Sequence, residues 1–165
     1  MSLLKVTRAQ EEIQTLKKFI ENQGIEFISE LAIQDKLLLR EPCDVSYQGV
    51  EYQITYGNRK MLGDIRKANH VRNKENLNVG GPFCKIGGST NYVQEISEAL
   101  KDKKNKSDKN MTLLIEVYPS PNLWFIKGSS LFLDLEEHFK KNERELGGLW
   151  QHIFVVFYDC NIQLR

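Results

Sequence analysis

The sequence predicts an α/β fold in which a mixed central sheet is flanked by helices. Three observations support this. Apolar residues recur at helical spacing near the N-terminus, residues 50–56 alternate between two faces as a strand does, and residues 111–118 and 152–159 are almost continuously apolar. Strands of the last kind are typical of a sheet covered on both faces. Because a helical segment precedes each of them, we expect right-handed crossovers and parallel strands there.

Length and composition indicate one globular domain over residues 1–165, with 41% hydrophobic and 27% charged residues. No apolar run approaches the roughly 20 residues that span a bilayer, and the N-terminus has no signal-peptide core, so we expect a cytoplasmic protein. The three cysteines are isolated, which argues against a disulfide framework and against a zinc site. The net charge of +1 excludes strong global attraction to nucleic acid but leaves room for a local basic surface.

The first half of the chain predicts a helix followed by a meander of strands. The helix covers residues 8–23 and stops at Gly24, because apolar residues repeat at helical spacing up to that glycine. Two short apolar stretches, 25–33 and 36–39, then predict a first strand and its continuation. The next strands, near 43–47 and 50–56, are joined by the Gln48-Gly49 turn, and so tight a connection makes them antiparallel.

The second half of the chain predicts helices alternating with buried strands. A second helix is expected at 58–74, an irregular glycine-containing loop at 78–89, a third helix at 91–103, a polar surface loop at 102–110, a strand at 111–118, a fourth helix at 129–142 and a last strand at 152–159. Tyr92, Val93, Ile96 and Leu100 are expected to form the inward face of the third helix. The full order is helix, two or three meandering strands, helix, strand, helix, strand.

Polar side chains gather on the predicted hairpin. Asp44 opens its first strand, while Glu51, Gln53 and Thr55 share one face of its second strand. The Asp44 carboxylate can meet Glu51 and Gln53 and form an oxygen-rich site for a hard divalent cation. A simpler interpretation is that this face is the wet side of an antiparallel hairpin. Glu116 is a further acid of interest, because a carboxylate inside an apolar strand needs a partner.

This order of elements and residues resembles the PD-(D/E)XK nuclease superfamily, which has the restriction-endonuclease-like fold. A helix with a glutamate, a strand, an aspartate that opens the next strand and a strand with an acid-x-polar motif follow one another in residues 8–57. The stretch EPCDVSYQGVEYQITY is also similar to that of a small group of bacterial proteins described as endonucleases. The resemblance implies a metal-dependent nuclease that hydrolyses nucleic-acid phosphodiester bonds with Mg²⁺.

Carried over to this chain, the proline-aspartate motif falls on Pro42 and Asp44, with a cysteine inserted between them. The acid-x-lysine motif falls on Glu51 and Gln53, with glutamine where the family usually has lysine. The resemblance then implies that Asp44 and Glu51 hold Mg²⁺, that Gln53 positions the attacking water and that Glu12 supports the site from the first helix. Glu12 is preferred to its neighbour in sequence because it flanks the buried stripe of that helix.

An alternative register remains open. It places Gln53 in the acidic position of the motif and leaves Asp44 as the only certain acid, which predicts that catalysis has been lost. The sequence is therefore compatible with two functions. One is the Mg²⁺-dependent nuclease, and the other is a catalytically inactive nuclease-fold module that binds nucleic acid or a protein partner.

Three lysines at heptad spacing are the candidate contacts to a phosphate backbone. Lys60, Lys67 and Lys74 would share one face of the predicted second helix, and the expected partner is nucleic acid, with DNA favoured over RNA. An ordinary solvated helix face is the simpler interpretation. Lys60 is also the nearest candidate to replace the lysine that the motif lacks.

Overall fold

The computed structural model describes residues 7–57, 92–117 and 130–165, and it has an α/β architecture. Its helices are α1 (Arg8–Glu21), the short 3-10 helix η1 (Ser29–Leu31), α3 (Tyr92–Lys104), α5 (Leu131–Lys141) and α6 (Glu143–Leu146). Its strands are β1 (Ala32–Ile33), β2 (Val45–Tyr47), β3 (Val50–Tyr56), β4 (Met111–Glu116), β5 (His152–Val156) and β6 (Asn161–Gln163). No helix in these ranges is both long enough and apolar enough to cross a membrane.

The six strands form one mixed sheet in the order β1-β2-β3-β4-β5-β6. The pairs β1-β2, β2-β3 and β5-β6 are antiparallel, whereas β3, β4 and β5 run parallel to one another. Parallel neighbours need long crossover connections, and α3 and α5 lie within the two crossovers of this sheet. The mixed sheet and the parallel strands predicted for the second half of the chain are therefore confirmed.

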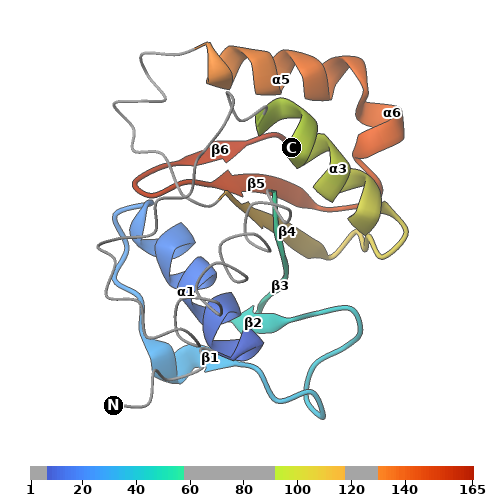
Figure 1. Cartoon of the computed structure of the whole chain (residues 1–165). Helices are drawn as coiled ribbons and strands as arrows, with labels where there is room; N and C mark the ends of the chain where they lie inside the picture. Colours follow the sequence, from blue (N-terminus) through green and yellow to red (C-terminus); the bar gives the residue numbers. More distant parts are fainter. Residues whose placement is uncertain (1–6, 58–91, 118–129) are drawn as a thin grey trace, which may run out of the picture.

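Helix α1 covers one face of the sheet, and α3, α5 and α6 group on the other (Figure 1). Helix α1 starts at a capping box, in which the side chains of Thr7 and Gln10 each accept a hydrogen bond from the backbone N–H of the other. Its apolar stripe then packs on the sheet across β4 and β5. This layer consists mainly of Leu16, Phe19, Ile20, Val45, Tyr47, Tyr52, Ile54, Leu114 and Val156.

The opposite face holds the larger apolar cluster. Side chains of β4 and β5 alternate between the two layers, because successive residues of a strand point to opposite faces. Leu113, Ile115, Ile153 and Val155 therefore belong to the layer of α3, α5 and α6, where Ile96, Leu100, Leu135 and Phe139 cover them. Every residue of β4 is buried, as its continuous apolarity predicted.

The β2-β3 hairpin is close to its prediction. Gln48 and Gly49 both have positive φ, 49° and 81°, which is typical of the two-residue type I′ turn that joins antiparallel strands. The turn sets Val45 opposite Tyr52. One residue before β2, Asp44 donates its backbone N–H to the carbonyl oxygen of Tyr52 at 2.9 Å, so the pairing continues up to the aspartate.

The region before the hairpin differs from its prediction. Only Ala32–Ile33 forms a strand within 25–33, and residues 36–39 form a turn instead of a continuation. The Asp35 side chain accepts the backbone N–H of Leu37 at 2.9 Å, and its carbonyl oxygen accepts that of Leu38 at 2.9 Å. These local bonds satisfy the backbone without a strand partner, so the aspartate overrides the apolar pattern.

Two elements near the C-terminus were not predicted. They are the one-turn helix α6 and the short strand β6, which returns after a tight turn to pair with β5. The predicted fourth helix is confirmed from Leu131 onwards. The predicted helix at 58–74 and the predicted loop at 78–89 lie outside the described residues.

Candidate functional site

Asp44 lies buried at the point where β2 meets β3. Its Oδ2 atom accepts two hydrogen bonds, one from the Gln53 side-chain nitrogen Nε2 at 2.7 Å and one from the backbone N–H of Ile54 at 2.8 Å. The carboxylate thus links the start of β2 to the middle of β3, in addition to the backbone hydrogen bonds between the strands. This leaves Oδ1 as the oxygen that faces away from β3 and towards other charged groups.

Gln53 is almost completely buried, and one end of its amide is unsatisfied. The residue is 3% exposed, and Nε2 donates to Asp44, but Oε1 has no hydrogen-bond partner in the described part of the chain. A buried polar atom without a partner is unfavourable and uncommon in folded proteins. Thr55, on the same face of β3, is also buried. The interpretation of this face as the wet side of a hairpin is therefore wrong at Gln53 and Thr55, which the layer of α3 covers, whereas Glu51 is partly exposed.

Glu12 reaches the same region from α1, where it is buried at the inner edge of the helix. Arg8 donates from Nε to Glu12 Oε1 at 3.0 Å. Burial, and then the negative charge of Asp44, raise the pKa of Glu12, while Arg8 and Lys36 act in the opposite direction. The Glu12 and Asp44 carboxylates are therefore close enough to repel each other.

Lys36 supplies the second positive charge of this group. Its Nζ atom lies 3.7 Å from Asp44 Oδ1 and donates to the Cys43 carbonyl oxygen at 3.4 Å. Although Asp44 is buried, most of the Lys36 side chain is exposed. We call the four side chains Arg8, Glu12, Lys36 and Asp44 the two-carboxylate cluster. Its two acids are buried and its two cations reach it from the surface.

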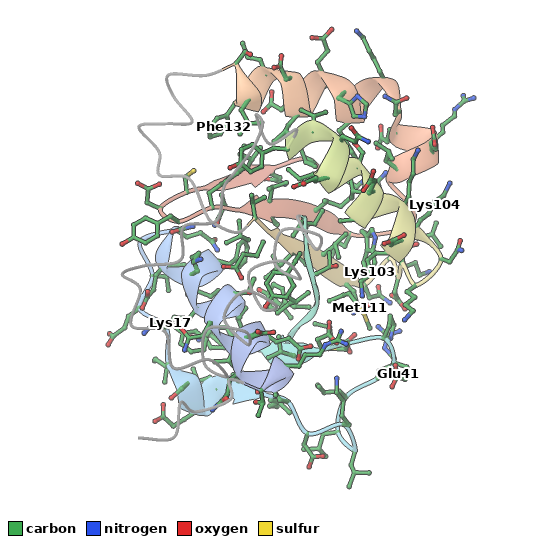
Figure 2. All side chains as sticks on the ribbon, in the orientation of Figure 1. Lys17, Glu41, Lys103, Lys104, Met111 and Phe132 are labelled. Carbon is green, nitrogen blue, oxygen red and sulfur yellow. The ribbon has the colours of Figure 1, made fainter. Side chains whose placement is uncertain are left out.

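Glu51 belongs to a different group of charges. Its Oε2 atom pairs with Arg40 Nη2 at 2.8 Å, and Nη1 of the same guanidinium pairs with Asp108 Oδ2 at 2.7 Å. The backbone N–H of Asn110, and then Arg40, lower the pKa of Asp108. Figure 2 shows Glu41, next to Arg40, on the same side of the molecule as Met111 at the start of β4. The contacts thus join Glu51 to the loop before β4 and not to Asp44.

Glu116 is the last residue of β4, and it is buried under α1. A carboxylate in such a place needs hydrogen-bond partners. Glu116 accepts hydrogen bonds from Thr15 Oγ1 and Lys18 Nζ, so the predicted need for partners is confirmed. Burial raises the pKa of the neighbouring Tyr56 to about 12. These bonds tie α1 to the carboxyl end of β4 and thereby help to hold the helix that carries Glu12.

The sequence identified Asp44, Gln53 and Glu12 as neighbours but missed Lys36 and Arg8. Arg8 stands four residues before Glu12, a spacing that indicates an ion pair on a helix, so a signal for it was present. Lys36 had no such signal, because its place depends on the turn at Asp35. Within the described ranges, no group of three or more His, Cys, Asp or Glu residues is arranged to hold a metal ion. The predicted phosphate contacts Lys60, Lys67 and Lys74 lie outside those ranges.

Comparison with known proteins found no match to this chain. A scan of the chain against protein-family models gave no match, and searches of curated proteins and of solved structures gave none. Any function must therefore be inferred from the geometry of the two-carboxylate cluster and from the sequence resemblance.

Proposed function

We propose that this protein is a metal-dependent nuclease of the PD-(D/E)XK type, with Asp44 and Glu12 as its metal ligands. The observation that carries the proposal is the pair of buried, mutually repelling carboxylates at the end of the β2-β3 hairpin. Two buried carboxylates that repel each other are stabilised by positive charge, which Arg8 and Lys36 supply in this structure and which a divalent cation could supply in their place. The element order also agrees with the resemblance, since α1, a meander of three strands, α3, β4, α5 and β5 follow one another.

The donor atoms fit a hard divalent cation. Mg²⁺ prefers oxygen ligands, keeps several waters and is usually held by one or two carboxylates. Asp44 Oδ1 carries no hydrogen bond from β3, and Arg8 bonds only one oxygen of Glu12, so both residues have oxygens to offer. When bound, Mg²⁺ would polarise the phosphate and lower the pKa of a coordinated water.

Gln53 has two roles in this proposal. Its Nε2 atom orients Asp44, and its Oε1 atom, which has no partner within the described ranges, can accept a hydrogen bond from a water and hold that water for attack. Because an amide carries no positive charge, Gln53 does not replace the lysine of the motif. The prediction that Glu51 holds the metal stays a prediction, and its ion pair with Arg40 favours Glu12 over it.

Three matched variants test the proposal. Plasmid, linear and single-stranded DNA are incubated with Mg²⁺ or Mn²⁺ and the wild type, Asp44→Asn, Glu12→Gln or Glu51→Gln. We expect cleavage by the wild type and Glu51→Gln, and none by the other two. Loss of activity in Glu51→Gln with activity retained in Glu12→Gln would instead make Asp44 and Glu51 the metal pair. Cleavage that survives Asp44→Asn would contradict both assignments.

A second function is favoured by the pairing of Glu51 with Arg40. Both registers place Gln53 near Asp44, but the alternative register needs no contact from Glu51, and Glu51 is paired with Arg40 instead. This pairing supports a nuclease-fold module that binds nucleic acid without cutting it. Binding of labelled DNA that weakens steeply with salt, with no cleavage under any divalent cation, would establish this function in place of the first.

A further inference from the structure

The cations of the two-carboxylate cluster are far more exposed than its acids. The side chains of Lys36 and Arg8 are 62% and 73% exposed, whereas those of Asp44 and Glu12 are 9% and 7% exposed. A long basic side chain in water can change its direction without opening a cavity. The buried carboxylates have no such freedom. The positive charges are therefore the movable members of the cluster.

Lys36 is placed to leave its carboxylate easily. Its 3.7 Å contact with Asp44 is longer than a normal hydrogen bond, and its bond to the Cys43 carbonyl oxygen is also long, at 3.4 Å. The turn that carries it is held by Asp35 and not by Lys36 itself. The next residue on this turn, Leu37, is almost fully exposed, so the turn projects into solvent. Moving the ammonium away would thus break no contact that maintains the fold.

The charge of the cluster depends on what occupies it. Two carboxylates and two basic groups are together neutral, so the cluster alone attracts no anion. A divalent cation on the carboxylates would add two positive charges and repel the two basic groups from the acids. These groups would then face solvent as free charges. A phosphate backbone is the anion that such a surface would attract in a nuclease-like protein.

We propose that Lys36 and Arg8 are internal counterions that a divalent cation displaces, so that metal binding creates the contact for the phosphate backbone. This inference rests on the metal site proposed above. It makes metal and nucleic acid mutually reinforcing ligands, because each must strengthen the binding of the other by the same factor. Lys36 then competes with the metal in the free protein and contacts phosphate in the loaded protein.

Calorimetric titration of Mn²⁺ without nucleic acid tests the competition. Lys36→Gln removes one competing charge and is expected to bind Mn²⁺ about threefold to tenfold more tightly than the wild type. The matched control is Lys141→Gln on α5, whose side chain is 70% exposed and pairs with Glu137 at 2.7 Å on the other face of the sheet. This control should leave Mn²⁺ affinity unchanged. Equal affinities for the two variants would overturn the inference.

Fluorescence anisotropy of a labelled DNA duplex tests the coupling. Duplex affinity is compared in EDTA and in Ca²⁺, which takes the same kinds of oxygen ligand as Mg²⁺. We expect Ca²⁺ to raise the affinity of the wild type about tenfold and that of Lys36→Gln clearly less. If the wild type binds Mn²⁺ but Ca²⁺ raises the duplex affinity of the wild type and of Lys36→Gln by the same factor, the role of Lys36 is refuted and the metal site is not. A wild type that binds no divalent cation would refute the metal site itself, so the two failures are distinguishable.

Discussion

Two groups of charges lie at opposite ends of one short hairpin, and they differ in how their charge is balanced. Around Glu51, one guanidinium lies between two carboxylates that are partly open to water, and the pKa of Asp108 is lowered. Around Asp44, two buried carboxylates repel each other, the pKa of Glu12 is raised and Gln53 Oε1 has no partner among the residues that the structure describes. The first group contains satisfied interactions. The second contains unfavourable features that the surrounding fold has to support.

This contrast separates a structural ion pair from a candidate site. Unsatisfied buried groups and raised carboxyl pKa values are found more often where a protein binds or reacts than where it only folds. The sequence motif alone favoured Glu51 as much as Asp44. Of the acids that the motif proposes, the contacts favour Asp44 and Glu12 over Glu51, because the carboxylate of Glu51 is paired with Arg40. The two groups are therefore expected to respond differently when each is changed.

The largest difference is expected from removing the two acids in turn. Asp44→Ala leaves the buried Ile54 N–H and Gln53 amide without an acceptor, and we expect the free energy of unfolding to fall by about 2 to 4 kcal/mol. Glu51→Ala removes only a partly exposed ion pair and should cost at most about 1 kcal/mol. Urea unfolding at pH 7 measures both. Equal losses would mean that the two groups do not differ as described.

A smaller effect with the opposite sign is expected at Glu12. Because its pKa is raised in the folded state, its contribution to stability is largest below the ordinary value of 4.5 and is lost as pH rises through the folded pKa. Glu12→Gln should therefore increase the free energy of unfolding at pH 7.5 by an amount on the order of 1 kcal/mol, and the gain should shrink near pH 4. Urea unfolding at the two pH values measures this. A variant less stable than wild type at pH 7.5 would contradict it.

The smallest effect is expected at Asp108. Its pKa is lowered in the folded state, so its contribution is present above its ordinary value of 3.8 and is lost as pH falls through the folded pKa. Asp108→Asn should lower the melting temperature slightly at pH 7, and the difference should fade on acidification and in high salt. The pH trends of the Glu12 and Asp108 variants should therefore be opposite. Parallel trends would remove the distinction between the groups.

Much of this fold follows from patterns that the sequence displays directly. The helical periodicity of residues 8–21 and the two-residue alternation of 50–56 each indicate which face of the element is buried. The type I′ turn at Gln48-Gly49 sets the register between β2 and β3. Such local features placed Asp44 beside Gln53. The burial of the polar face of β3 could not be predicted, because it depends on α3, which is distant in the chain.

The charged partners were harder to predict than the carboxylates. Lys36 reaches Asp44 only because Asp35 turns the chain back, and the apolar residues around that turn suggested a strand. Arg40 meets Asp108 across 68 positions of sequence, a separation at which no periodicity carries information. Long flexible side chains take their place from the tertiary structure. A sequence therefore indicates acids on strands more readily than the cations that neutralise them.

Two asparagines couple the beginning of the chain to its last strand. Asn22, which caps α1, donates from Nδ2 to Asn161 Oδ1 at 2.9 Å and to the Phe157 carbonyl oxygen at 3.0 Å, and Asn161 donates back to the Phe19 carbonyl oxygen at 2.9 Å. Contacts so distant in sequence form late, because a long loop must close first. During synthesis on the ribosome, α1 cannot make these contacts until residue 161 has emerged. A nascent fragment that ends before residue 161 would therefore lack these bonds, and the helix that carries Glu12 would be held less firmly beside the β2-β3 hairpin.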